Sequence, residues 1–341
     1  MTWSHNGEKV VLEYRGAFTV NDTDTDIATL SPGGYLRISD GAWLRGRSLE
    51  VTADSSGHLT RRFYVGSGER PFEPEGRLWL AGFFPRFVRQ SGFGAKERVA
   101  RILSQGGVPA VLTEISLIDG SYAKKVYFTQ LLKQAPLDAA IARRVLEQAG
   151  REIDSDYELA TTLIDAADKL LIDDATRKAY FDAARQIDSD YEMRRVYSAA
   201  LKRGGVSPAL MAGILEGSSA LESDYEAASL LLDVVTDHAI EGPLRAPFFS
   251  SLGKIESSYE KGRVLQALLR RTDVSADTLL AVMSEASRVG GDYETAQVLV
   301  AAARTQAING AARETYIKTA ERLGDYERDR ALAALVRTEK R

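Results

Sequence analysis

Cysteine is absent from this sequence, and histidine is scarce. The 341 residues contain no cysteine and only three histidines, His5, His58 and His238. A chain without cysteine forms no disulfides and has no thiolate metal ligands or thiol nucleophiles. The histidines stand alone rather than at zinc-ligand spacing, and the metallopeptidase signature His-Glu-x-x-His is missing. We therefore expect no metal, no cofactor and no catalytic residues, and thus a protein that is not an enzyme.

Long hydrophobic runs and an excess of positive charge are also missing. No apolar run approaches the roughly 18 residues that span a bilayer, so we expect no transmembrane segment. The net charge is −4, and phosphate binding requires concentrated positive charge, so nucleic acid is not the expected partner. The charge is uneven, because residues 77–150 hold 11 Lys/Arg and 5 Asp/Glu whereas residues 151–341 hold 25 and 32.

Tyrosine recurs at a fixed interval along the last two-thirds of the chain. The spacings are 35, 34, 34, 34, 34 and 33 residues between Tyr122, Tyr157, Tyr191, Tyr225, Tyr259, Tyr293 and Tyr326. A constant period of this length indicates an array of helical pairs that bury their apolar stripes against their neighbours. The tetratricopeptide residue pattern is missing, which favours a HEAT-like α-solenoid of about seven 34-residue repeats.

Four of these tyrosines lie in a helix-start signature. The segments are Ser155–Glu158, Ser189–Glu192, Ser223–Glu226 and Ser257–Glu260. Serine followed three residues later by glutamate predicts a capping box, in which the serine hydroxyl accepts the glutamate N–H and the glutamate side chain returns to the serine N–H. We expect the tyrosines to be structural markers that pack between adjacent repeats, with a binding surface as the alternative.

The first 72 residues read as a small antiparallel β domain. Short segments rich in β-branched and aromatic residues alternate with turn clusters, at Lys9–Tyr14, Ala17–Val20, Tyr35–Ile38, Ser48–Thr52 and Leu59–Val65. The chain opens at Thr2 almost directly into strand-like sequence, from which we expect a processed or trimmed N-terminus. The predicted fold class is α+β, with a β domain at 1–72, a connecting amphipathic helix at 73–92 and the solenoid at 93–341.

The connecting segment is aromatic and basic. Trp79, Phe83 and Phe84 follow helical spacing over Glu75–Val88, with Arg86 and Arg89 beside them. Pro85 should bend the helix or end its first half. The segment is either core between the domains or a candidate interaction surface for a membrane or an apolar partner.

Two further patterns have structural explanations. Asp22, Asp24 and Asp26 alternate as in a calcium loop, but Gly33 stands where the bidentate glutamate belongs, so we expect a solvated turn. The pairs Gly106-Gly107, Gly204-Gly205 and Gly290-Gly291 are expected near helix ends.

Several segments resemble a family of bacterial proteins in which a small β domain precedes helical repeats. They are Phe18–Ile27, Leu30–Tyr35, Arg61–Val65 and Arg70–Phe72, with Ile-x-Ser-Asp-Tyr-Glu at Ile153–Glu158 and Ile187–Glu192. Related segments in that family lie outside the cytoplasmic membrane, some fused to membrane metallopeptidases of the beta-lactam-sensor type. The resemblance implies an extracytoplasmic (periplasmic) location peripheral to the membrane, with a cytoplasmic one as the alternative. It implies no peptidase activity.

Together these patterns predict a non-enzymatic interaction scaffold. The expected partner is protein, namely a bacterial membrane protein complex to which the chain is an extrinsic accessory subunit, for example a photosynthetic or respiratory one. The alternative is a periplasmic sensor or regulatory module that acts through a membrane partner.

Overall fold

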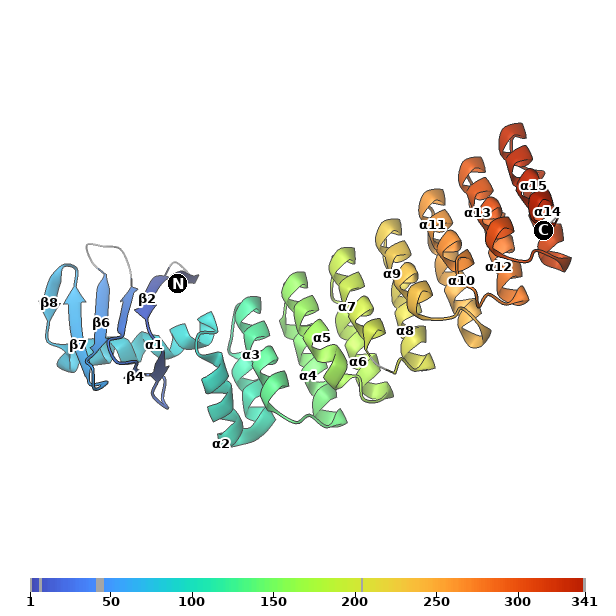
Figure 1. The fold of residues 1–341 in the computed structure, drawn as a ribbon. Helices are drawn as coiled ribbons and strands as arrows, with labels where there is room; N and C mark the ends of the chain where they lie inside the picture. The colour runs from blue at the N-terminus through green and yellow to red at the C-terminus, as the bar shows by residue number, and fades with distance from the viewer. Residues whose placement is uncertain (1, 6–7, 41–45, 204, 340–341) are drawn as a thin grey trace. The chain divides into compact units, whose positions relative to one another are not determined.

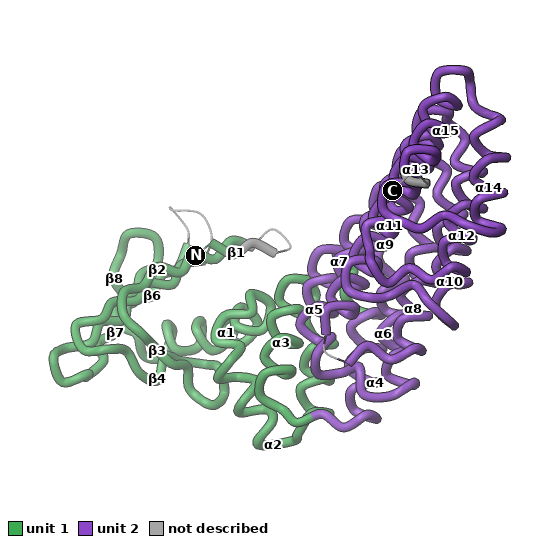
Figure 2. Tube along the Cα trace, turned by 45° about the vertical axis from the view of Figure 1, so that its right-hand side comes forward, with its two compact units in different colours: residues 1–136, 152–154 green, residues 137–151, 155–341 purple. Residues whose placement is uncertain are grey.

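The computed structural model describes residues 2–5, 8–40, 46–203 and 205–339. It contains strands followed by helices that pack in neighbouring pairs, which confirms the predicted α+β class with helical repeats (Figure 1). The chain forms two compact units (Figure 2). Unit 1 comprises residues 1–136 and 152–154, and unit 2 comprises residues 137–151 and 155–341. This division falls among the helical repeats.

Unit 1 begins with antiparallel strands. They are β1 (Thr2–His5), β2 (Glu8–Arg15), β3 (Phe18–Val20), β4 (Ile27–Leu30), β5 (Tyr35–Asp40), β6 (Arg47–Ala53), β7 (Leu59–Val65) and β8 (Gly68–Arg70). Six of them form one sheet in the order β1-β2-β5-β6-β7-β8, and β3 pairs with β4. All five predicted strands are present. The sequence did not predict β1, β4 or β8, since β4 and β8 are short strands among polar turns.

The register of the large sheet brings apolar residues into line on one face. Leu12 lies opposite Ile38, Ile38 opposite Leu49, and Leu49 opposite Phe63. All four side chains are fully or almost fully buried. Because side chains alternate between the two faces of a sheet, this line fixes the face that must be covered.

Helix α1 (Arg77–Ser91) covers that face. It follows a short turn, η1 (Phe72–Gly76), and its Trp79, Phe84 and Phe87 belong to the same core cluster as the sheet. The helix does not end at Pro85, because α1 runs through this residue. The burial of Phe84 and Phe87 on either side offsets the hydrogen bond that proline cannot donate.

Two further helices complete unit 1, α2 (Ala95–Ser116) and α3 (Ser121–Gln134). Helix α2 is interrupted at Gly107, whose φ of 64° and ψ of −165° are open to glycine and strained for other residues. The predicted helix end at Gly106-Gly107 is thus a break between two helical segments. Gly290 lies between two helices as predicted, whereas Gly204 is outside the described residues.

Unit 2 consists of helices joined by short turns. They are α4 (Ala139–Glu152), α5 (Asp156–Leu170), α6 (Asp174–Ala184), α7 (Asp190–Lys202), α8 (Pro208–Ser218), α9 (Asp224–Asp237), α10 (Arg245–Lys254), α11 (Ser258–Leu269), α12 (Ala276–Ala286), α13 (Asp292–Thr305), α14 (Gly310–Ala320) and α15 (Asp325–Glu339), with a turn η2 (Gly242–Leu244) before α10. From α5 onward each odd-numbered helix packs on the next odd-numbered one, and from α6 onward each even-numbered helix packs on the next even-numbered one (Figure 1). The repeats therefore form two layers.

The leucine-rich stripes of the first helices form the core between these layers. Leu163 and Leu170 in α5 are fully buried, as are Val264, Leu265 and Leu269 in α11. Unit 2 thus buries its apolar stripes between successive repeats, as the period predicted.

Small residues let the layers approach closely. A Cβ atom at Gly217 of α8 would lie 2.2 Å from the Cζ atom of Tyr197 in α7. The ring of Tyr197 is buried and stacks on Phe181 of α6, with ring centroids 5.5 Å apart. Gly217 is therefore required by packing rather than by a turn.

Candidate interaction surface

Each marker tyrosine is the second residue of a first helix. Tyr122 occupies this place in α3 of unit 1, and the other six occupy it in α5, α7, α9, α11, α13 and α15 of unit 2. The prediction of equivalent places is confirmed. We call the six tyrosines of unit 2 the tyrosine row: Tyr157, Tyr191, Tyr225, Tyr259, Tyr293 and Tyr326.

The serine half of the predicted capping box is present in the structure. Ser155, Ser189, Ser223 and Ser257 are the N-cap residues of their helices, and each hydroxyl accepts the N–H of the glutamate three residues on. The N···O distances are 3.3–3.5 Å, at the long end for a hydrogen bond. The caps therefore set where each helix begins, with modest strength.

The other half of the predicted box is wrong at Ser189, Ser223 and Ser257, because an aspartate of the preceding repeat accepts the serine N–H. The Asp156 carboxylate accepts the Ser189 N–H at 2.8 Å, and Asp190 accepts the Ser223 N–H at 2.6 Å. Asp224 accepts the N–H groups of Ser257 at 2.7 Å and Glu256 at 3.1 Å. The aspartates that precede Tyr157, Tyr191 and Tyr225 thus join their repeats to the next, a role that their 34-residue period could have indicated.

The glutamates that follow the tyrosines form ion pairs instead. Glu192 and Glu260 lie 2.5 Å from Arg195 and Arg263, one helical turn further on. Glu226 pairs with Arg194 of the preceding repeat. The pairs of Glu192 with Arg195 and of Glu260 with Arg263 join residues three apart on one helix and are partly shielded from water. They hold Arg195 and Arg263 over the start of the helix.

The tyrosines are exposed, which corrects the expectation that they pack between repeats. Side chains of the tyrosine row are 52–78% exposed, and Tyr122 is 57% exposed. The apolar positions behind them, such as Leu159 and Leu163, already fill the space between helices. A regular aromatic residue with this exposure is not needed for packing, so its regularity favours the binding alternative.

Arginine side chains lie over several rings of the tyrosine row. The Arg195 guanidinium carbon is 5.8 Å from the ring centroid of Tyr157 in the preceding repeat and 5.9 Å from that of Tyr191 in its own. Arg263 bridges Tyr225 and Tyr259 in the same way, at 5.7 and 5.9 Å. These distances fall within the range of cation–π contacts, so a guanidinium group lies between the rings at two junctions of the row, Tyr157–Tyr191 and Tyr225–Tyr259.

The aromatic segment of α1 is core. Trp79 and Phe84 are 6% and 0% exposed and lie with the sheet residues in one cluster, while Phe83 is partly buried against them. The Trp79 indole donates a hydrogen bond of 2.7 Å to Asp40. Arg86 is exposed and Arg89 pairs with Glu114 of α2. The burial contradicts the use of Trp79 and Phe84 as surface anchors and agrees with the core interpretation.

The predicted solvated turn is wrong for two of its three aspartates. Asp22 is exposed, but Asp24 and Asp26 are 4% and 8% exposed. Asp24 accepts hydrogen bonds of 2.6 Å from both Arg98 and Arg101 of α2, and Asp26 pairs with Arg61. The alternating aspartates therefore attach the β3–β4 turn to its neighbours within unit 1.

Arg98 is the centre of this buried network. Its guanidinium also donates to Glu114 at 2.6 Å and to the Tyr127 hydroxyl at 2.8 Å. Burial by itself lowers the pKa of Arg98, but Tyr127, Asp24 and Glu114 outweigh burial and raise that pKa above its ordinary value. Burial raises the pKa of Tyr127 despite the opposing charge of Arg98. The network is fully paired, which suits a structural role.

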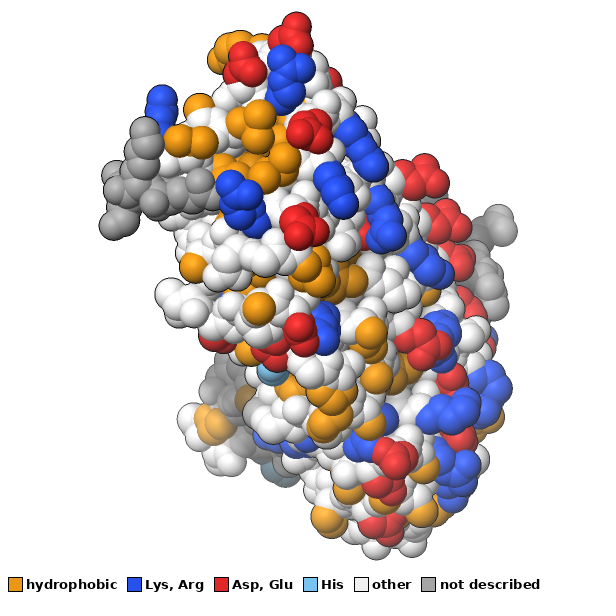
Figure 3. Space-filling model, turned by 90° about the vertical axis from the view of Figure 1, so that its right-hand side faces the viewer, with side chains coloured by type: hydrophobic (Ala, Val, Ile, Leu, Met, Phe, Trp, Pro, Cys, Tyr) orange, Lys and Arg blue, Asp and Glu red, His pale blue; other side chains and the backbone are white. Residues whose placement is uncertain are grey.

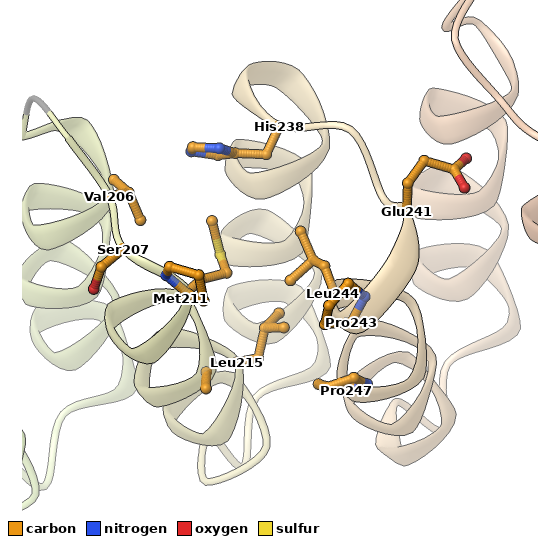
Figure 4. Close-up of a pocket in the computed structure, with 11 residues that line it drawn as sticks. Val206, Ser207, Met211, Leu215, His238, Glu241, Pro243, Leu244 and Pro247 are labelled. Atoms are coloured by element: carbon orange, nitrogen blue, oxygen red, sulfur yellow. The ribbon is translucent and has the colours of Figure 1, made fainter.

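One apolar pocket lies between α8 and the η2–α10 turn of unit 2. It has a volume of about 230 Å³ and is lined by Met211, Leu215, Leu244 and Pro247 among others. His238 is one of the lining residues and its ring points toward the side of Val206, whereas the Glu241 side chain points away from the pocket (Figure 4). Glu241 accepts hydrogen bonds from the Ser275 N–H and hydroxyl. Burial tends to raise the pKa of Glu241, but these bonds outweigh it and lower that pKa.

The two histidines whose side chains are described belong to different units. His58 is exposed in unit 1 and His238 lies at the pocket of unit 2, while the side chain of His5 is outside the described residues. Within the described part of the chain, no group of three His, Cys, Asp or Glu side chains is placed to hold a metal ion. The face in Figure 3 carries acidic and basic side chains side by side, with small hydrophobic groups between them.

Comparison with known proteins gave no match. Searches against protein-family models, curated proteins and solved structures found nothing similar to this chain. Among the described residues, no helix is long and apolar enough to cross a membrane. The resemblance to the bacterial repeat family, based on the segments quoted above, therefore stays a prediction.

Proposed function

We propose that this protein is a non-enzymatic interaction scaffold and that the tyrosine row is its contact surface. The observation that carries the proposal is the exposure of 52–78% at six equivalent tyrosines in successive repeats. Repeat arrays present extended binding surfaces because the contact area grows with each repeat while the backbone stays rigid. Tyrosine is a frequent anchor in protein interfaces because it buries a large ring with little loss of side-chain freedom.

The backbone beneath the tyrosine row is held in register, which favours binding. Four of the six tyrosines follow an N-cap serine. At Tyr157, Tyr191 and Tyr225 the preceding aspartate also ties the helix start to the next repeat. A surface that is ordered before its partner arrives loses less conformational entropy on binding. The row therefore supplies both anchors and the preorganisation that makes anchors effective.

The proposed host is a bacterial membrane protein complex outside the cytoplasmic membrane, with this chain as a peripheral accessory subunit. The support for this setting is the resemblance of segments such as Ile153–Glu158 and Ile187–Glu192 to the bacterial repeat family. Photosynthetic and respiratory assemblies are examples of such hosts. The partner in each case is protein.

Site-specific photo-crosslinking tests the proposal. A photoreactive phenylalanine analogue at Tyr225 should form a crosslink to a membrane protein in cells that produce this chain. The same analogue at Ala246, an exposed residue of α10 in the other layer, should not. Equal adducts from both positions, or none from any tyrosine of the row, would contradict the assignment of this surface.

A second candidate function, ligand sensing, is favoured by the apolar pocket beside His238. Its volume of about 230 Å³ suits a small apolar molecule or a single side chain. A sensor should show a raised melting temperature with a small ligand, and Met211→Trp should abolish that rise by filling the pocket. Enzymatic turnover that disappeared in His238→Gln would refute both candidates.

A further inference from the structure

The tyrosine row lies in an acidic part of the surface. Three consecutive segments, Ile187–Glu192, Leu221–Glu226 and Ile255–Glu260, contain eight Asp or Glu and no Lys or Arg. Within them Asp188, Glu222 and Glu256 are exposed, three residues before their tyrosines, and form no ion pair with another described residue. Each of three successive repeats therefore presents a tyrosine ring and a free carboxylate at the same place.

The basic residues nearby do not cancel this charge. Arg194, Arg195 and Arg263 are already paired with Glu226, Glu192 and Glu260. Each helix start carries a partial positive charge. The inter-repeat aspartates Asp190 and Asp224 neutralise part of it, because their carboxylates accept the N–H groups of Ser223 and Ser257. Asp188, Glu222 and Glu256 face solvent, and the exposed Lys254 two residues before Glu256 offsets one of these three charges. The net charge that remains is negative and attracts a cationic partner.

The rings themselves accept cations. Arg195 and Arg263 lie 5.7–5.9 Å from the ring centroids of the tyrosines on either side of them. More than half of each tyrosine side chain is still in solvent. Arg195 and Arg263 therefore already make cation–π contacts with these rings. An arginine or lysine of a partner would make the same kind of contact on the part of each ring that is still exposed.

The distance between successive repeats suits an extended polypeptide partner. Packed helices lie about 8–10 Å apart, so tyrosines in neighbouring repeats recur at about that distance. A polyproline-II segment advances about 9 Å per turn of three residues. Every third side chain of such a segment therefore meets the next tyrosine and carboxylate.

We propose that the tyrosine row binds an extended, polyproline-II-like polypeptide segment that carries Arg or Lys at every third residue. Each cation lies on a tyrosine ring and beside the carboxylate of Asp188, Glu222 or Glu256. This inference rests on the proposed function and names the chemistry of the partner segment.

Fluorescence anisotropy with labelled peptides tests the inference on the full chain. The probe is a peptide of about five Arg-Pro-Pro triplets, which forms a polyproline-II helix. It should bind, and binding should weaken about tenfold when salt rises from about 0.05 to 0.5 M, because the carboxylates are exposed and screened. A Glu-Pro-Pro peptide and a peptide of the same composition with its arginines in one block should bind at least about tenfold more weakly.

Two triple variants test whether the peptide binds at the tyrosine row. Asp188→Asn with Glu222→Gln and Glu256→Gln should weaken the Arg-Pro-Pro peptide about tenfold. Replacing Tyr191, Tyr225 and Tyr259 together by alanine should do the same with an unchanged melting curve, because these side chains are exposed. The control variant removes three exposed acids of the second helices, by Glu216→Gln, Asp277→Asn and Glu314→Gln. Glu216 and Asp277 pair with Arg185 and Arg245, and the variant should bind as the wild type does.

Three results would overturn the inference: no binding of the Arg-Pro-Pro peptide, equal binding of the block peptide, or equal loss in the control variant. Displacement of the peptide by a neutral oligosaccharide would also overturn it in favour of a glycan ligand. If the peptide fails while Tyr225 still crosslinks to a membrane protein, the partner has a different chemistry and the proposed function stands. If both fail, the tyrosine row is not a contact surface.

Discussion

Asp224→Ala tests how the repeats are joined. The Asp224 carboxylate accepts the Ser257 N–H at 2.7 Å and the Glu256 N–H at 3.1 Å, across the junction between α9 and α11. A hydrogen bond to a charged group contributes about 1.5–3 kcal/mol. The shorter bond is partly buried and the longer one is exposed, so water replaces most of the second. Adding about 0.5 kcal/mol for the charge near the start of α11, we expect a loss of about 2–3 kcal/mol in the free energy of unfolding.

Urea unfolding followed by circular dichroism measures this loss, and amide hydrogen exchange locates it. Exchange should accelerate at Glu256 and Ser257 and at the start of α11. Asp224→Asn should lose about half as much, because the amide oxygen accepts one bond without charge. Asp237→Ala at the exposed end of the same helix is the matched control and should change stability by less than about 0.5 kcal/mol.

The result that would refute this reasoning is equal stability of Asp224→Ala and Asp237→Ala. Unchanged exchange at Glu256 and Ser257 would have the same meaning. Either result would show that apolar packing alone holds α9 and α11 in register.

Four further predictions concern other parts of the chain. Arg98→Met should cost about 3–5 kcal/mol in urea unfolding, because it leaves buried carboxylates unpaired; a cost under about 1 kcal/mol would contradict the network. Ser189→Ala should cost about 1 kcal/mol through the lost cap, and no change would place the helix start elsewhere. Alanine at both Trp79 and Phe84 should prevent folding, since each loss costs about 3–5 kcal/mol; a folded variant in circular dichroism would refute their core position. Burial raises the pKa of Tyr197 to about 12, so its stabilising contribution is complete below pH 10, where the unfolded phenol titrates, and is lost as pH rises to about 12. Tyr197→Phe should therefore lessen the alkaline loss of stability, and should change stability at pH 7 by less than about 1 kcal/mol because its hydroxyl has no hydrogen-bond partner among the described residues.

The repeat architecture and the strands of the sheet could be read from local pattern alone. The period of the tyrosines and the cap serines such as Ser189 set where each helix begins, because caps and apolar stripes act over a few residues. The strands around Ile38 and Leu49 could likewise be predicted, because apolar and polar residues alternate along them. These features need no knowledge of what lies across the fold.

What the tyrosines and aspartates do was decided only by tertiary structure. A periodic tyrosine is compatible with packing or exposure, and it is exposed because residues such as Leu163 already fill the space between repeats. The N–H groups of Ser189, Ser223 and Ser257 could have bonded to the glutamate of the same helix start, but the aspartate 33 residues earlier accepts each of them. The sequence predicts Asp24 to be a solvated turn residue. In the folded chain Arg98, 74 residues later, donates a hydrogen bond to its carboxylate. Sequence patterns report local preference, whereas burial and charge pairing depend on segments that meet only when the chain is folded.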